Sequence, residues 1–198
     1  MRKNSSERYG AALTDALLMT SRDGVTFQRW GEAFLRPGIQ RPGTWHYGQQ
    51  YVAWHAVETA SALSGAPGEL SFYATESYWT GAGSELRRYT LRLDGFVSIQ
   101  AGAAGGELQT PPLTFQGRQL VVNFATSAAG SLRVEVQDAA GQPLPGFAAA
   151  DCVELFGDDV DRRVRWAGGK SLQEIAGQAV RLRFVLREAD LFAIEFRE

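Results

Sequence analysis

The chain has 198 residues, of which 44% are hydrophobic, so it has room for one large or two small domains with a buried core. Its formal net charge is −2 and its basic residues are dispersed singly rather than clustered, which argues against a nucleic-acid partner. The single cysteine, Cys152, excludes an intrachain disulfide and a multi-cysteine zinc site.

The N-terminus carries the adjacent cations Arg2 and Lys3 but no apolar segment after them, so no signal peptide is visible. No stretch approaches the roughly 20 apolar residues that span a bilayer. We therefore expect a soluble protein without a membrane partner, and its compartment stays open.

The first predicted unit is a β-hairpin. Strands at 16–21 and 25–30 flank Asp23-Gly24, and an Asp-Gly pair supplies the positive φ angles of a tight turn. After a loop at 36–43, strands are predicted at 51–58 and 69–77, the second rich in β-forming residues.

Apolar and polar residues alternate from Arg88 to Leu93, as in a half-buried strand. Asp94-Gly95 then turns the chain into a strand at 96–101. Further strands, each with one apolar face, are predicted at 120–126, 132–137, 160–166, 180–186 and 191–196. Two such faces closed against each other predict a β-sandwich, jelly-roll-like, in an all-β chain.

Helix is scarce in this pattern. Ser171 and Glu174 have the spacing of a capping box and predict one short helical turn. Asp151 and Glu154 have the same spacing, which predicts a second turn at 151–156.

Several pieces of the chain resemble bacterial glycoside-hydrolase-like proteins related to glycoside hydrolase families 32 and 43. RRYTLRLDGFVSI (87–99), GELQTPPLTF (106–115), VEVQDAAGQPLPGF (134–147), DCVELFGDD (151–159) and VRLRFVLREADLFAIEF (180–196) resemble their C-terminal region. LLMTSRDGVTFQRW (17–30), WHYGQQYVAW (45–54) and ELSFYATESYW (69–79) resemble the last blade or so of a β-propeller.

The resemblance implies two modules. Residues 1–85 would form an incomplete propeller-like β region and residues 86–198 a β-sandwich. It also implies that the chain is an accessory or remnant part of a protein that binds or helps to process glycans, so that its expected partner is carbohydrate.

The catalytic motifs of family 32 do not occur in this chain. Its nucleophile lies in an Asn-Asp-Pro-like motif, its transition-state stabiliser in Arg-Asp-Pro and its acid in Glu-Cys, so no catalytic residue is carried over. A propeller closes with at least about four blades, whereas the residues before Leu86 supply one or two. We expect a fragment, a truncated reading frame, or a reduced protein that covers its open sheet edges with missing blades or with copies of itself.

Whether the chain is an enzyme stays open on sequence grounds. Glycoside hydrolysis needs two carboxyl groups, and Asp23, Glu58 and Glu76 are the candidates in the first half. Glu76 is the weak catalytic candidate because it ends a strand beside aromatic residues. The alternative is an ordinary solvated or salt-bridged glutamate.

A group of aromatic and polar residues in the first half predicts carbohydrate binding, because flat rings cover the apolar faces of sugars. Its members are Trp45, His46, Tyr47, Trp54, His55, Glu76, Tyr78 and Trp79. The alternative is packing inside a propeller blade. His46 and His55 have no third ligand, so no metal site is predicted from them.

A structural calcium ion is a further hypothesis, with loop capping as the alternative. Its candidate ligands are Asp151, Asp158, Asp159, Asp161 and Asp190.

Two other functions stay open beside glycan binding: an assembly module that oligomerises through exposed blade edges, and a small self-contained glycosidase with a second carboxylate near Glu76. Glycan binding predicts an open cleft lined by Trp45, Trp54 or Trp79. Assembly predicts buried rings and a large apolar intersubunit surface.

Overall fold

The structure is a computed structural model that describes residues 13–39, 50–76 and 85–198. Strands make up 53% of the described residues, and no helix among them reaches seven residues, which confirms the all-β prediction. The chain divides into two compact units, 1–91 (unit 1) and 92–198 (unit 2). The division falls between Leu91 and Arg92, a few residues after the boundary predicted at 85/86.

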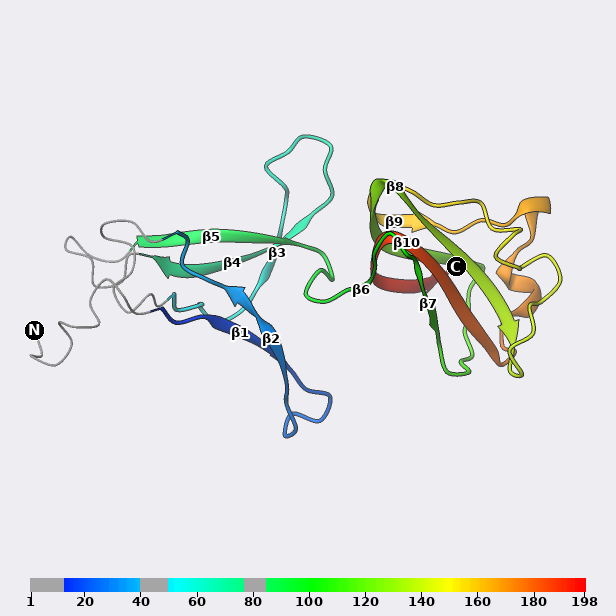
Figure 1. The fold of residues 1–198 in the computed structure, drawn as a ribbon, viewed down its shortest axis with the longest axis horizontal. Coiled ribbons are helices and arrows are strands. Elements are labelled where there is room, and N and C mark those ends of the chain that lie inside the picture. Colours follow the sequence, from blue (N-terminus) through cyan, green and yellow to red (C-terminus); the bar gives the residue numbers. More distant parts are fainter. Residues whose placement is uncertain (1–12, 40–49, 77–84) are drawn as a thin grey trace, which may run out of the picture. The chain divides into compact units, whose positions relative to one another are not determined.

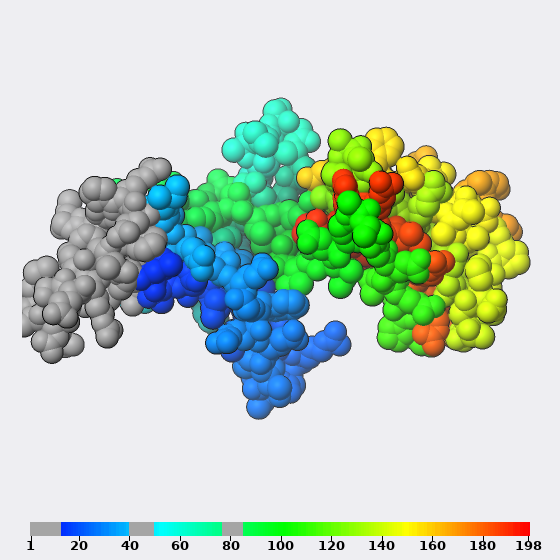
Figure 2. All heavy atoms as spheres, viewed as in Figure 1, coloured from blue at the N-terminus to red at the C-terminus, as the bar shows by residue number. Residues whose placement is uncertain are grey.

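Unit 1 begins with the predicted hairpin, which is confirmed. Strands β1 (Ala16–Thr20) and β2 (Gln28–Leu35) pair antiparallel. The connection is longer than a two-residue turn, because Asp23 Oδ1 accepts hydrogen bonds from the backbone N–H of Val25 at 2.9 Å and of Thr26 at 2.7 Å. These bonds hold Val25 and Thr26 in the loop, whose tip projects from unit 1 in blue in Figure 2.

A second sheet of unit 1 has the order β3-β4-β5, built from β3 (Val57–Thr59), β4 (Glu69–Glu76) and β5 (Glu85–Arg92) (Figure 1). The strand predicted at 51–58 is interrupted. Val52 forms an isolated bridge with Ala74, and regular pairing resumes only at Val57. His55, between them, has a φ of 72°, which a continuous strand does not allow.

The core of unit 1 is small. The Phe72 ring stacks on Tyr89 with a centroid distance of 5.6 Å and lies 5.3 Å from Phe34. Among the described residues of unit 1, the buried hydrophobic side chains are those of Leu35, Phe72 and Ala74. The described part of unit 1 therefore gains little stabilisation from apolar burial.

Unit 2 is built on one antiparallel sheet that curls into a half barrel (Figure 1). The order is β6 (Ile99–Ala101), β10 (Val180–Arg197), β8 (Gln119–Asp138) and β9 (Asp158–Arg163), and β7 (Gly106–Gln109) also pairs with β10. The strands predicted separately at 120–126 and 132–137 are one strand, β8. Those predicted at 180–186 and 191–196 are likewise one strand, β10.

β8 and β10 each bend at the centre and remain continuous strands there. Glu188 has a φ of 42° at a register shift between Arg187 and Ala189. Opposite this irregularity, a Cβ on Gly130 would lie 2.8 Å from the carbonyl oxygen of Arg187 and still nearer that of Glu188. Glycine at 130 therefore permits the close approach of β8 and β10 at the bend.

The core of unit 2 follows the period-2 pattern of these strands. Alternate residues of β8, among them Leu120, Phe124 and Val134, are fully buried, and the loops between strands close the curled sheet with Phe147 and Trp166. Cys152 belongs to this core as a free, buried thiol. Burial of each large side chain contributes about 1.5–3 kcal/mol before entropy is counted.

Among the described residues, the helical content is two short 3₁₀ turns, η2 (Ala167–Gly169) and η3 (Leu172–Ile175). The predicted capping box at Ser171 and Glu174 is confirmed at the start of η3. The second turn predicted at 151–156 is wrong. Within this segment, Cys152 forms an isolated β-bridge with Trp166, and Leu155 forms one with Leu132. The side chains of Cys152 and Leu155 are buried in the core of unit 2.

Within the part of the chain that the structure describes, no helix has the length and hydropathy needed to cross a membrane.

Candidate functional site

The sequence-predicted carbohydrate residues divide into two groups. Those outside the described residues are Trp45, His46, Tyr47, Tyr78 and Trp79. Trp54, His55 and Glu76 are described, and all three belong to unit 1. The geometry of the candidate site is therefore the geometry of these three residues.

Trp54 stands out from the β3-β4 ladder on a bulge. Ala53 N–H donates to Tyr73 O at 2.8 Å and Val57 pairs with Ser71, so residues 54–56 face Phe72 alone. The Trp54 side chain is 87% exposed, and the His55 ring lies edge-on to it at 5.3 Å. An exposed indole supported in this way can stack on the apolar face of a ligand.

Glu76, at the end of β4, has both carboxylate oxygens engaged. Tyr89 Oη donates to Oε1 at 2.5 Å, and Arg87 Nε approaches Oε2 at 2.5 Å. Tyr89 Oη in turn accepts from Gln50 Nε2 at 2.8 Å. Glu76 thus has the contacts of a salt-bridged strand-end glutamate.

The pKa of Tyr89 is shifted by its surroundings in this group. Burial, followed by the hydrogen bond to Glu76 and its charge, raises the pKa of Tyr89 to about 12. The phenol therefore stays protonated at neutral pH and donates to Glu76. The side-chain oxygen of Gln50 is buried and has no hydrogen-bond partner among the described residues.

A glycosidase needs a second carboxyl group near the first. In the described part of the chain, none of the hydrogen bonds or ion pairs of Glu76 involves another carboxyl group. The Asp23 carboxylate accepts hydrogen bonds within its own turn, from Thr26, Val25 and Ser21. These bonds hold the pKa of Asp23 below the usual range. Glu58 lies on β3, opposite Leu70.

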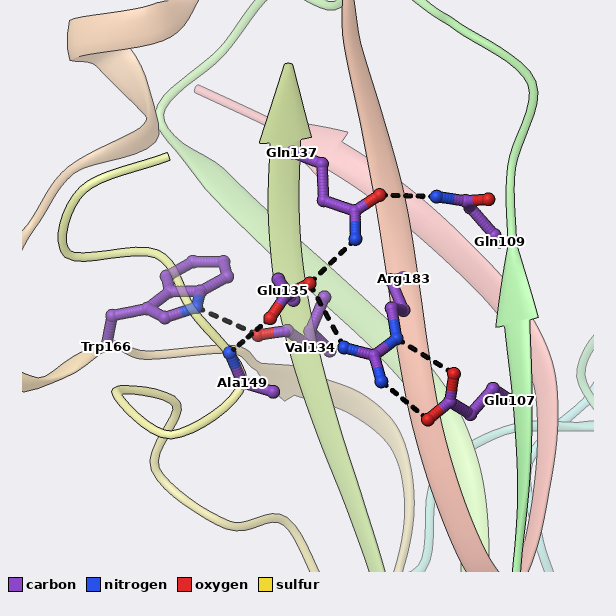
Figure 3. Close-up of polar contacts among 8 residues, drawn as sticks. All are labelled: Glu107, Gln109, Val134, Glu135, Gln137, Ala149, Trp166 and Arg183. Atoms are coloured by element: carbon purple, nitrogen blue, oxygen red, sulfur yellow. Dashed lines mark hydrogen bonds and ion pairs between the residues drawn. The ribbon is translucent and has the colours of Figure 1, made fainter. Parts of the chain in front are cut away.

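A second polar group crosses β7, β10 and β8 in unit 2 (Figure 3). Arg183 donates to Glu107 through Nε at 2.9 Å and Nη2 at 2.5 Å, and through Nη1 to Glu135 Oε1 at 3.2 Å. Gln137 donates to Glu135 at 2.7 Å and accepts from Gln109 at 2.5 Å. The two carboxylates therefore share one guanidinium.

Glu135 is the buried centre of this group. Its second oxygen accepts from Ala149 N–H at 3.0 Å, which ties the loop after β8 to the sheet. Burial works against its ionisation, but the hydrogen bonds from Ala149, Gln137 and Arg183 prevail and lower its pKa. Each polar atom that a dashed line joins in Figure 3 has a hydrogen-bond or ion-pair partner within unit 2. This group therefore stabilises unit 2.

Unit 2 also has a depression of about 390 Å³. Its lining residues are Leu93, Asp94, Val121, Asn123, Val160, Asp161, Ala193, Ile194, Glu195 and Arg197. Arg197 links Asp161 and Glu195 at 2.6 Å each. Apolar walls beside carboxylates and a guanidinium suit a small polar ligand, and the volume lies in the range of about 300–1,000 Å³ of ligand sites.

Four of the five aspartates considered for calcium form other side-chain contacts. Asp158 pairs with Arg92, Asp159 with Arg162, and Asp161 with Arg197. Asp190 accepts from Ser98 at 2.7 Å. Among the described residues, no group of three or more His, Cys, Asp or Glu side chains is placed to hold a metal ion.

The sequence interpretation missed Arg92 and Arg183 as organising residues. Period-2 alternation identified both as polar positions on strands, but their partners lie far along the chain, such as Glu107 for Arg183. Only strand order and register bring such residues together, and a single sequence does not display either.

No family model, curated protein or solved structure matches this chain. Fold and site together define an all-β protein whose second unit is a curled half-barrel sheet.

Proposed function

We propose that the chain binds carbohydrate without hydrolysing it, as an accessory or remnant part of a bacterial glycoside-hydrolase-like protein. The observation that carries the proposal is the 87% exposure of Trp54, on a bulge beside His55. An indole ring covers the apolar face of a pyranose or furanose while polar neighbours bind its hydroxyl groups.

The surroundings of Glu76 support the non-catalytic part of the proposal. Arg87 and Tyr89 occupy its two oxygens. A retaining or inverting mechanism requires one carboxyl group that delivers a proton and a second that acts as base or nucleophile. The family resemblance, with its catalytic motifs missing from this chain, agrees with this interpretation.

The test is affinity electrophoresis of the full chain in gels that contain inulin, levan, arabinan or xylan. We expect at least one of these neutral glycans to retard the protein. Trp54→Ala should weaken that binding by about tenfold, since an aromatic stacking contact contributes about 0.5–1.5 kcal/mol beyond its buried area. Phe27→Ala, which removes a 52% exposed ring elsewhere in unit 1, is the matched control. Equal loss in both variants would contradict the role of Trp54.

A second candidate function is assembly, with a further copy of the chain or with separate propeller blades as partner. A different observation favours it: unit 1 exposes Leu17, Met19 and Leu86 while it buries few apolar side chains. The order β3-β4-β5 also leaves β3 and β5 as sheet edges, which pair readily with other strands.

Light scattering after gel filtration distinguishes this second candidate. Assembly with copies of itself predicts a multimer that Met19→Lys and Leu86→Lys dissociate. A monomer at all concentrations would exclude self-assembly and leave added blades as the partner to test.

A further inference from the structure

Three arginines of unit 2 have guanidinium groups that are unpaired among the described residues, and they line one or both of two depressions. Arg118, Arg163 and Arg165 are exposed, and within the described part of the chain no side chain or carbonyl accepts a hydrogen bond or ion pair from them. Arg187, at the bend of β10, is also unpaired among the described residues, and Arg181 donates to backbone carbonyls. The remaining arginines of unit 2 are bound to carboxylates. These are Arg92, Arg133, Arg162, Arg183 and Arg197.

The backbone fixes where these three side chains start. Arg163 is in β9 and pairs with Val121 of β8. The carbonyl of Arg165 accepts from Val153 N–H at 2.9 Å, and Arg118 N–H donates to Arg197 O at 2.8 Å. The three guanidinium groups therefore extend from ordered backbone, which reduces the entropy lost when they bind a ligand.

Two depressions share Arg163 and Arg165 in their linings. The larger, about 450 Å³, is lined by Val153, Glu154, Leu155, Asp161, Arg162, Arg163 and Arg165. The smaller, about 170 Å³, is lined by Arg118, Leu120, Arg163, Val164, Arg165, Trp166, Gly169, Lys170 and Leu172. In Figure 2 the segment around 150–165 is coloured yellow to orange and lies at the surface.

Each acidic residue of these depressions forms an ion pair, and Asp161 shares its arginine with Glu195. Glu154 pairs with Arg133 at 3.0 Å, and Asp161 pairs with Arg197 at 2.6 Å. The smaller depression has no acidic residue in its lining, and its Lys170 pairs with Glu174 at 2.8 Å. What remains is positive charge above an apolar floor that includes the buried side chains of Val164 and Trp166.

We propose that the two depressions form one anion-binding groove for an acidic polysaccharide, one that carries carboxylate or sulfate groups. Guanidinium forks bind such oxyanions through paired hydrogen bonds. The choice of a polysaccharide rests on the proposed carbohydrate function. The inference that the ligand is an anion rests on the arginines alone.

The same groove is poorly suited to nucleic acid. Proteins that bind single strands stack bases on exposed aromatic rings, whereas Trp166 is 5% exposed and its indole N–H donates to Val134 O at 2.9 Å. Three unpaired arginines in a chain of net charge −2 are also fewer cations than stable phosphate-backbone binding uses.

The experiment titrates the full chain with polygalacturonate and with dextran sulfate, at low and at physiological salt. We expect binding that weakens as salt rises, because charged contacts on a surface are screened. Arg163→Gln combined with Arg165→Gln should lower the affinity about five- to tenfold. These side chains have no internal partner, so the double variant should keep its fold, which urea unfolding checks.

Arg187→Gln is the matched control, because Arg187 is exposed at the bend of β10 and also has no side-chain partner among the described residues. Unchanged affinity in Arg187→Gln supports the groove. Equal loss in the control, no binding of either polymer, or tighter binding of a DNA decamer than of polygalacturonate would overturn the proposal.

Trp54→Ala separates this proposal from the preceding one. Loss of neutral-glycan binding with polygalacturonate binding intact is the expected result for that variant. If the wild type binds no neutral glycan but still binds polygalacturonate, the groove stands and the role of Trp54 fails.

Discussion

Arg92, the first residue of unit 2, is hydrogen-bonded to the buried side chain of Asn123 in β8. Arg92 Nε donates to Asn123 Oδ1 at 3.0 Å, and Asn123 Nδ2 donates to Leu93 O at 2.7 Å. Arg92 also pairs with Asp158 at 2.7 Å and lies 4.4 Å above the ring of Phe192. The side chain of Asn123 is buried, so both of its polar atoms depend on these partners.

Removal of this guanidinium should therefore destabilise the fold. Arg92→Met is expected to lower the free energy of unfolding by about 1–3 kcal/mol, since it leaves Asn123 Oδ1 without its donor. Urea denaturation measures the change. Arg187→Met, which loses no described contact, should stay within about 0.5 kcal/mol of the wild type. Equal destabilisation by both substitutions would show that the Arg92 contacts are unimportant.

Gly130 offers a test of the bend in the long strands. Gly130→Ala places a methyl group against the carbonyls of Arg187 and Glu188 and should cost about 1–3 kcal/mol of stability. Gly102→Ala is the control, because a Cβ there meets no atom within 4 Å. Thermal unfolding of the two variants distinguishes steric conflict from a general effect of losing glycine.

Glu135 should make stability depend on acid pH. Its folded-state pKa is lowered, so its contribution is present above the unfolded value of about 4.3 and is lost as pH falls through the folded value. We expect Glu135→Gln to destabilise the protein at pH 7 and to flatten the decline in stability at acid pH. Glu58→Gln, which removes a charge from an exposed strand position, should keep the wild-type decline.

Tyr89 should make stability depend on alkaline pH. Its pKa is raised to about 12, so the stability that it contributes is complete below the usual tyrosine value of about 10 and is lost as pH rises towards 12. Ultraviolet absorbance at high pH should show the late titration of Tyr89. Tyr89→Phe should remove that transition, and Tyr73→Phe, on the exposed side of β4, should keep it.

Local patterns predicted a large part of this fold. β-forming residues identified β4, and alternation identified strand positions of β8 and β10. Asp23-Gly24 identified the hairpin, and Ser171 with Glu174 identified the capped turn at η3. Each of these features is encoded within a few residues. Sequence reasoning divided β8 and β10 at their centres because small and charged residues there are typical of turns, whereas the bend depends on the contact of Gly130 with β10.

The candidate sites were harder to predict for the same reason. The exposure of Trp54 follows from the positive φ of His55, a residue that seldom adopts this conformation and gives no local signal of it. The groove around Arg163 and Arg165 depends on which carboxylates the fold assigns to the other arginines. Strand register decides which ion pairs form, such as those of Glu154 with Arg133 and of Asp161 with Arg197.

The proposal of glycan binding without hydrolysis is tested most directly in a single sample. The full chain is incubated with the neutral glycan that retards it most, and bound glycan and newly formed reducing ends are measured together. We predict saturable binding that Trp54→Ala reduces, with no reducing ends above a protein-free control. Release of reducing ends that Glu76→Gln abolishes, or no binding of any neutral glycan by the wild-type chain, would contradict the account.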